Sequence, residues 1–161
     1  MVLLKITAYL SLLFISYDDF RERKVYWFLF PIVGFFLGII HFNNTIELQI
    51  FLYQVLVNFT LVTLVLILLY LIVKLVLKKT FLNHSLGLGD ILFFYAFACG
   101  FPTITFLILF VNSIVFFLLF YLILRKRLHL NPIPLAGIMS LFVLGVFVLS
   151  TFIKQPSLYY L

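Results

Sequence analysis

The longest stretch of the chain without a charged residue covers positions 91–124, which is 34 residues. A helix needs about 20 predominantly apolar residues to cross a membrane, so this stretch is long enough for nearly two short spans. The rest of the chain is similar, since 66% of its 161 residues are hydrophobic and 10% are charged, against about 25% charged in a typical soluble domain. The composition therefore predicts a membrane protein and excludes a soluble enzyme, a nucleic-acid-binding module and a disordered chain.

Charged residues and prolines divide the chain into six apolar segments, which predicts an all-α polytopic membrane protein of about six transmembrane helices. The predicted spans are residues 2–17, 26–42, 49–73, 91–104, 105–124 and 133–153. Gly100 and Pro102 mark the expected break between the fourth and fifth spans. Residues 1–161 are predicted to form a single integral-membrane domain, with the first segment kept as a span rather than a cleaved signal peptide.

Basic residues gather in the first, third and fifth loops between these spans. They are Arg21, Arg23, Lys24, Lys74, Lys78, Lys79, Arg125, Lys126 and Arg127. The second and fourth loops, residues 43–48 and 99–103, contain no Lys or Arg. Because loops rich in Lys and Arg face the cytoplasm, this alternation predicts that both termini lie outside. The net charge of +6 then reflects orientation in the membrane rather than binding to nucleic acid.

The chain has only five acidic residues. Glu47 is interpreted as a solvated loop charge, and Glu22 as a local balance for its basic neighbours. The other three are predicted to lie on the cytoplasmic side, with Asp18 and Asp19 following the first span and Asp90 opening the fourth. A carboxylate at the C-terminal end of a helix opposes the helix dipole, so capping does not explain the first two. Asp90 also suits an N-cap, and its sequence position leaves a structural and a chemical role open.

Two aspartates on one membrane face are suited to hydrolysing a peptide bond. When two carboxylates lie close together they do not both ionise, so one keeps a proton while the other acts as a base. The base removes a proton from water, and the acid protonates the carbonyl oxygen of the substrate. This chemistry needs neither a metal nor a cofactor.

Two short motifs resemble those of the type IV prepilin peptidases. Residues 16–25 (SYDDFRERKV) are similar to the family's first motif, an Asp followed by a basic stretch, and residues 87–90 (GLGD) are similar to its Gly-x-Gly-Asp motif. In the family a branched residue follows six positions after the first catalytic Asp, and Val25 stands six positions after Asp19. The resemblance therefore implies Asp19 and Asp90 as the catalytic pair and Asp18 as a neighbour.

The resemblance also implies a location and a substrate. It implies an aspartic endopeptidase of the prokaryotic cell (inner) membrane that removes the leader of prepilin-like proteins at the cytoplasmic face, in a type IV pilus or protein secretion system. The expected partners are this substrate and the lipid bilayer. Tyr26 and Trp27 stand where the family usually has Pro-Asn, and the lone Cys99 excludes the paired-cysteine insert of the longer members. We therefore expect the short form, without methyl transfer and without a cofactor or metal.

Three alternatives stay open on the sequence alone. A presenilin-like intramembrane protease would use Asp18 with Asp90. A non-enzymatic membrane protein, such as a transporter or an assembly subunit, would use Asp90 as a helix cap and Asp19 as a loop charge. An inactive peptidase homologue would keep both aspartates without activity.

Polar residues elsewhere have simpler interpretations. His41, His84 and His129 show no metal-ligand spacing and are expected to be interfacial, whereas Asn58 is expected to hydrogen-bond across helices.

Overall fold

The described residues of the computed structural model are 2–21, 25–75, 87–128, 134–152 and 158–159. They form six helices and no strand, which confirms the all-α prediction for this part of the chain. The helices are α1 (Val2–Arg21), α2 (Leu29–Asn43), α3 (Leu48–Leu75), α4 (Leu88–Ala98), α5 (Thr103–Leu128) and α6 (Leu135–Phe152). Each helix covers most of one predicted apolar segment.

Helices α1 and α5 extend beyond their predicted C-terminal ends, whereas α4 ends at Ala98, six residues before its predicted end. Helix α1 continues to Arg21, so Asp18 and Asp19 belong to its last turn rather than to a loop. Arg21 supports this turn, because its guanidinium donates to the Tyr17 hydroxyl at 2.8 Å, one turn earlier. Helix α5 likewise continues past the predicted end at residue 124 to Leu128.

The expected break between the fourth and fifth apolar segments is confirmed. Helix α4 ends at Ala98 and α5 begins at Thr103. Pro102 directly precedes α5, where its missing N–H is not needed, and its carbonyl accepts from Phe106 N at 2.8 Å.

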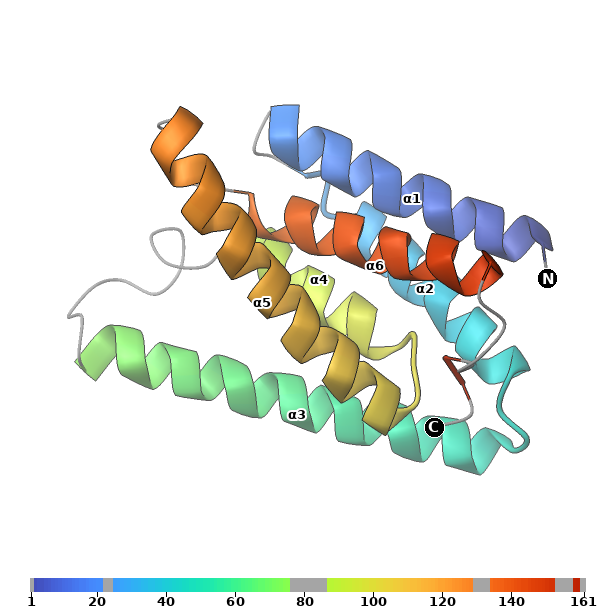
Figure 1. The fold of residues 1–161 in the computed structure, drawn as a ribbon. Coiled ribbons are helices and arrows are strands. Elements are labelled where there is room, and N and C mark those ends of the chain that lie inside the picture. The colour runs from blue at the N-terminus through green and yellow to red at the C-terminus, as the bar shows by residue number, and fades with distance from the viewer. Residues whose placement is uncertain (1, 22–24, 76–86, 129–133, 153–157, 160–161) are drawn as a thin grey trace.

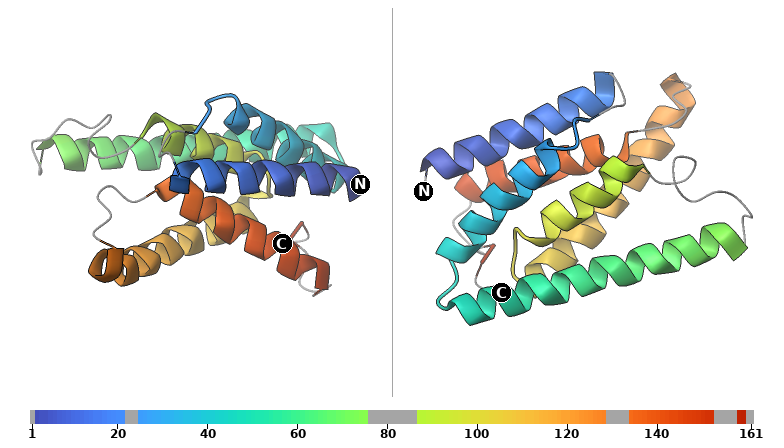
Figure 2. Two further views of the ribbon diagram at one scale, coloured as in Figure 1. Left: turned by 90° about the horizontal axis from the view of Figure 1, so that it is seen from above. Right: turned by 180° about the vertical axis from the view of Figure 1, so that it is seen from behind.

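The helices pack in two layers (Figures 1 and 2). In one layer α2 lies between α1 and α4, and α3 packs against the other side of α4. In the second layer α6 packs against α1 and α5, and α5 packs against α3. Consecutive helices run in opposite directions, so α1, α3 and α5 end on the same side of the bundle on which α2, α4 and α6 begin (Figure 1).

The interior of the bundle contains a cluster of phenylalanine side chains. Phe97 is fully buried and makes edge contacts with Phe101 and Phe106, at ring-centroid distances of 5.7 and 5.6 Å. Helices α2 and α4 approach closely at Gly34, where a Cβ would lie 3.2 Å from the Ala96 Cα. This contact fixes α4 against α2.

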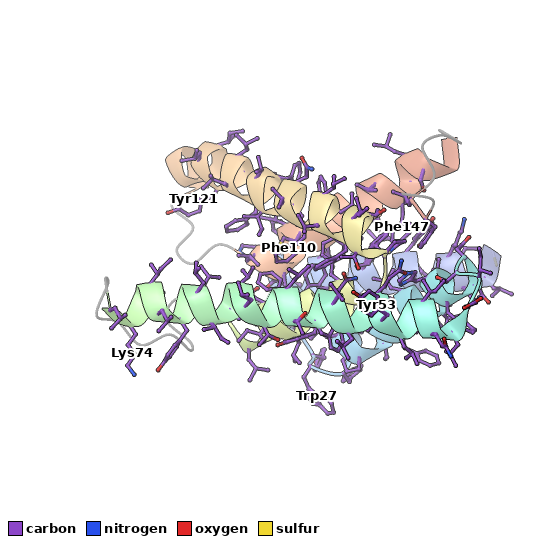
Figure 3. The ribbon with its side chains drawn as sticks, turned by 90° about the horizontal axis from the view of Figure 1, so that it is seen from below. Trp27, Tyr53, Lys74, Phe110, Tyr121 and Phe147 are labelled. Carbon is purple, nitrogen blue, oxygen red and sulfur yellow. The ribbon has the colours of Figure 1, made fainter. Side chains whose placement is uncertain are left out.

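The outer surface is apolar as well, with many side chains of α3 and α5 pointing away from the bundle (Figure 3). By length and composition, Leu48–Leu75 and Thr103–Ile123 are long enough to cross a membrane, whereas α2, α4 and α6 are shorter apolar helices. Only 11% and 17% of the two long segments' most apolar windows are buried inside the bundle. An apolar surface this extensive is unusual on a soluble monomer, so these two helices point to a membrane protein.

Candidate functional site

Both predicted catalytic aspartates contact the first turn of α6. Asp19, in the last turn of α1, accepts a hydrogen bond from Gly137 N to its Oδ2 at 2.6 Å. Asp90, in the first turn of α4, accepts one from Ala136 N to its Oδ1 at 3.0 Å. The two donors are amides of adjacent residues, which with standard bond lengths puts the two acceptor oxygens within about 9 Å of each other. We call this region of the bundle the aspartate end.

The start of α6 explains why carboxylates gather there. Pro134 directly precedes the helix, and its fixed φ favours helix initiation. The first amides of a helix have no carbonyl partner within the helix and carry partial positive charge. Asp19 and Asp90 satisfy two of these amides, and they thereby join α1 and α4 to α6.

Gly137 lets Asp19 approach α6 closely. A Cβ at this position would lie 3.0 Å from the Asp19 Cβ and 3.1 Å from its Oδ2. Any other residue would therefore displace the carboxylate or the helix. Gly145, two turns further along α6, has no atom within 4 Å of the same hypothetical Cβ.

Asp90 also caps its own helix, but not as the N-cap residue. Helix α4 begins at Leu88 with Gly87 as its extended N-cap, so Asp90 occupies the third helical position. From there its Oδ2 accepts from Gly87 N at 3.0 Å, as the acid of a capping box does. The N-cap interpretation of Asp90 is therefore corrected, because the extended backbone at Gly87 starts the helix earlier. Behind this turn, a Cβ at Gly89 would lie 3.2 Å from the Phe30 ring.

The surroundings of Asp90 act on the pKa of its carboxyl group in opposite directions. Burial raises the pKa of Asp90 above its ordinary value, while the hydrogen bonds from Gly87 and Ala136 oppose this rise. Asp90 precedes the predicted span that begins at residue 91. An upward shift of a carboxyl pKa is in the direction that general-acid catalysis requires.

Other predicted residues lie away from this contact. Asp18 is partly buried beside Asp19, and Glu47 is exposed in the α2–α3 loop, as expected. Glu22, His84 and His129 lie outside the described residues. In the described part of the chain, no three His, Cys, Asp or Glu side chains group closely enough to hold a metal ion.

A second polar group, at the opposite end of the bundle, was only partly anticipated. The Asn58 amide donates to the carbonyls of Ala98 and Phe101 at 3.0 and 2.9 Å, which confirms its expected cross-helix bonding. His41 was expected at an interface but is fully buried. Its Nδ1 donates to the Cys99 carbonyl at 3.1 Å, and its Nε2 lies 3.0 Å from Gln54 Oε1. We call Asn58, His41 and Gln54 the polar cluster.

The signal that would have found the polar cluster is the expected break near Gly100. A helix that ends inside an apolar bundle leaves carbonyl groups without partners, and these groups need donors from neighbouring helices. Asn58 and His41 are the donors that meet the carbonyls at the end of α4.

Comparisons with known proteins found no relative of this chain. A scan against models of protein families, a search of curated proteins and a search of solved structures each found no match to the chain. A functional interpretation therefore depends on the two short motifs and on the geometry of the residues within them.

Proposed function

We propose that the protein is a membrane aspartic endopeptidase that removes the leader of prepilin-like proteins, with Asp19 and Asp90 as its catalytic pair. The observation that supports this proposal best is the contact of both aspartates with adjacent amides of α6. The two residues are 71 positions apart in the sequence, and each belongs to one of the two motifs that resemble the prepilin peptidases.

The proposed reaction assigns a different role to each carboxyl group. Ionised Asp19 takes a proton from water while the water oxygen attacks the carbonyl carbon of the scissile bond, and Asp90 donates its proton to the carbonyl oxygen. In the second step the C–N bond breaks. Asp19 then gives its proton to the leaving nitrogen, and Asp90 recovers a proton from the intermediate as the C=O bond re-forms. The pair returns to its starting state without a covalent intermediate.

The proposed setting is the prokaryotic cell membrane, with six spans, of which the fourth begins after Asp90. The apolar outer surface of α3 and α5 supports this, as does the alternating direction of the helices. In this arrangement the aspartate end faces the cytoplasm, because the basic residues gather where α1, α3 and α5 end. Both termini then lie outside.

A non-enzymatic membrane protein is the second candidate, and one observation favours it. The same hydrogen bonds that bring the aspartates together also satisfy amides that α6 would otherwise leave unpaired. Asp19 and Asp90 would then only hold the helices together. The two candidates differ in the expected effect of an isosteric, uncharged replacement on proteolysis.

The test is cleavage of a co-expressed prepilin-like substrate in membranes, read as a shift in its size on a gel. Asp19→Asn and Asp90→Asn should each lower the cleavage rate by at least about 100-fold, the usual contribution of general acid–base catalysis. Asp18→Asn is the matched control, because it removes the neighbouring carboxylate on the same helix turn and should leave cleavage unchanged. Protein levels are measured alongside.

Two outcomes would contradict the proposal. Cleavage that depends on Asp18 and Asp90 but not on Asp19 would favour the presenilin-like alternative. If the wild-type protein cleaves nothing and the variants differ only in abundance, the aspartates are structural and the second candidate is correct.

A further inference from the structure

Two residues after α6 pack back against the end of the bundle that holds the polar cluster. Leu158 and Tyr159 are partly buried and contact the apolar core. The Tyr159 ring stacks on Phe101, which lies between α4 and α5, at a ring-centroid distance of 5.9 Å, and it lies 6.2 Å from the His41 ring of α2. Figure 1 shows these two residues in dark red alongside the bundle. We call Leu158 and Tyr159 the latch.

Tyr159 is a partly exposed residue that packs on two fully buried side chains. His41 and Phe101 have no exposed surface, whereas Tyr159 is only partly buried. Phe51 also meets the His41 ring, edge-on at 5.1 Å, but it belongs to α3. Tyr159 belongs to a turn instead, so it can move away from His41 without unfolding a helix. Its position is that of a removable cover.

The packed latch leaves two hydroxyl groups without partners. The hydroxyl oxygens of Tyr159 and Tyr9 are shielded from solvent, and neither forms a hydrogen bond within the described part of the chain. Burial raises the pKa of Tyr159, and repulsion from Tyr9 raises it further, which shows that the two hydroxyls lie close together. Hydroxyls that are buried without partners oppose packing of the latch, whereas stacking of Tyr159 on Phe101 favours it. Because the two contributions are of comparable size, the balance between a packed and a released latch can shift.

We propose that the latch is a conformational switch that shields His41 and Phe101 from water when it is packed and lets water reach them when it is released. Release gives the hydroxyls of Tyr9 and Tyr159 the hydrogen-bond partners that they lack in the packed state. Water at His41 competes for the Cys99 carbonyl, which its Nδ1 meets at 3.1 Å, so release loosens the contact between α2 and the end of α4. This inference concerns the end of the bundle opposite the aspartates, and it holds whether or not the protein is a peptidase.

The released state can be measured through the reactivity of His41. Diethyl pyrocarbonate modifies accessible histidine rings, and mass spectrometry of the peptide that contains His41 gives the modification rate in the purified protein. Tyr159→Phe keeps the stacking ring and removes an unpaired hydroxyl, so it should favour the packed latch and lower the rate by about tenfold. Tyr159→Ala removes the cover and should raise the rate by at least about tenfold.

Two further variants and a change of solvent sharpen the test. Tyr9→Phe removes the second unpaired hydroxyl and should slow modification as Tyr159→Phe does. Tyr53→Phe is the matched control, because the Tyr53 side chain is 69% exposed and its hydroxyl can reach water in both states, so the rate should equal that of the wild type. Modification through release of the latch should also stay constant at low urea concentrations, whereas modification through global unfolding rises with urea.

Three outcomes would overturn the proposal. Faster modification of Tyr159→Phe than of the wild type would show that the hydroxyl holds the latch in place. Equal rates in Tyr159→Ala and the wild type would assign the burial of His41 to its other neighbours. A wild-type rate that rises at low urea concentrations would make the exposure of His41 a global event. If Tyr159→Ala does not fold, the comparison of Tyr159→Phe with Tyr53→Phe still decides between a switch and a fixed contact.

Discussion

Both ends of the bundle contain helix ends with unpaired backbone groups, and different kinds of side chain satisfy them at each end. At the aspartate end, free amides at the start of α6 meet the carboxylates of Asp19 and Asp90. At the other end, free carbonyls around the end of α4 meet the side-chain donors of Asn58 and His41. The first pair is partly buried and ionisable, whereas Asn58 and His41 are fully buried.

This difference suggests that the two ends of the bundle contribute to different properties of the protein, one to activity and the other to stability. The buried Asn58 amide, which pairs with two carbonyls, is a stable end state, because an amide does not titrate. A carboxylate costs more to bury than an amide, so a chain that needed only a cap for α6 would be served as well by Asn or Ser. We therefore expect changes at the aspartate end to alter activity and changes at the polar cluster to alter stability.

The largest expected effect comes from adding one methyl group at the aspartate end. Gly137→Ala should displace the Asp19 carboxylate, since the new Cβ would lie 3.1 Å from its Oδ2. Misplacement of a catalytic group by about 1 Å lowers rates by about 100-fold, and a loss of this order is expected in the membrane cleavage assay. Gly145→Ala, on the same helix, should keep wild-type activity. Equal activity of the two variants would show that the contact between Asp19 and α6 is not needed for cleavage.

At the polar cluster, Asn58→Leu should lower the free energy of unfolding by about 1–3 kcal/mol, because two buried carbonyls lose their donor. Asn112 on α5 is the matched control, since it is exposed and, among the described residues, its amide bonds to the Ile108 carbonyl of its own helix. Asn112→Leu should therefore have little effect. Both are measured by unfolding in detergent, together with cleavage per folded molecule, which neither should change. A folded Asn58→Leu protein without activity would contradict the expectation that the polar cluster affects stability alone.

A smaller effect is expected from pH. Because the pKa of Asp90 is raised in the folded protein, the folded state binds more protons than the unfolded state between the ordinary pKa of 3.8 and the raised value. Stability should therefore fall as pH rises through this window, by at most about 1.4 kcal/mol per pH unit. Unfolding measured across this range should show the slope in the wild type and lose it in Asp90→Asn. A slope that persists in the variant would assign the effect to another group.

The smallest change to the protein moves its fluorescent tryptophan from one position to another, which tests the orientation of the bundle in the membrane. Trp27, the only tryptophan, precedes α2, whereas Tyr53 lies in the second turn of α3, and both side chains are 69% exposed. In inverted membrane vesicles, iodide added outside should quench Trp27 fluorescence, because the proposed topology places it on the cytoplasmic face. The double variant Trp27→Phe, Tyr53→Trp should resist quenching. Equal quenching of both proteins would contradict the proposal that the two ends face opposite sides.

The helices were largely predictable from the sequence, whereas their packing was not. Charged residues and Pro102 separate the apolar segments, so six helices can be predicted from the apolar composition and from these boundary residues. The last turn of α1 was missed because its two aspartates were interpreted as a loop. The break near Gly100 indicates that buried donors are needed, but helices that are apolar on every side do not show in their sequence which face is buried. The sequence therefore does not identify His41 as one of these donors.

The two motifs singled out Asp19 and Asp90, but nothing local in the sequence predicts their shared partner. Asp19 meets an amide 118 positions later, and that amide carries no side-chain signature. The tight approach at Gly137 likewise becomes visible only when α1 and α6 are packed together. Backbone donors brought in from a distant helix are the part of the site that sequence motifs do not encode.

Because Asp19 and Asp90 bind adjacent amides of α6, insertions and deletions should be tolerated in the loops but not in the first turn of α6. Loops between the helices can gain or lose residues without moving the aspartates, provided that the helices still pack. A single insertion within the first turn of α6 would turn the following residues by about 100°, and both contacts would be lost in one event. The contacts of Asp19 and Asp90 thus both depend on the helical register of the first turn of α6. Related proteins that keep Asp19 and Asp90 should therefore keep the spacing from Pro134 to Gly137 without gaps.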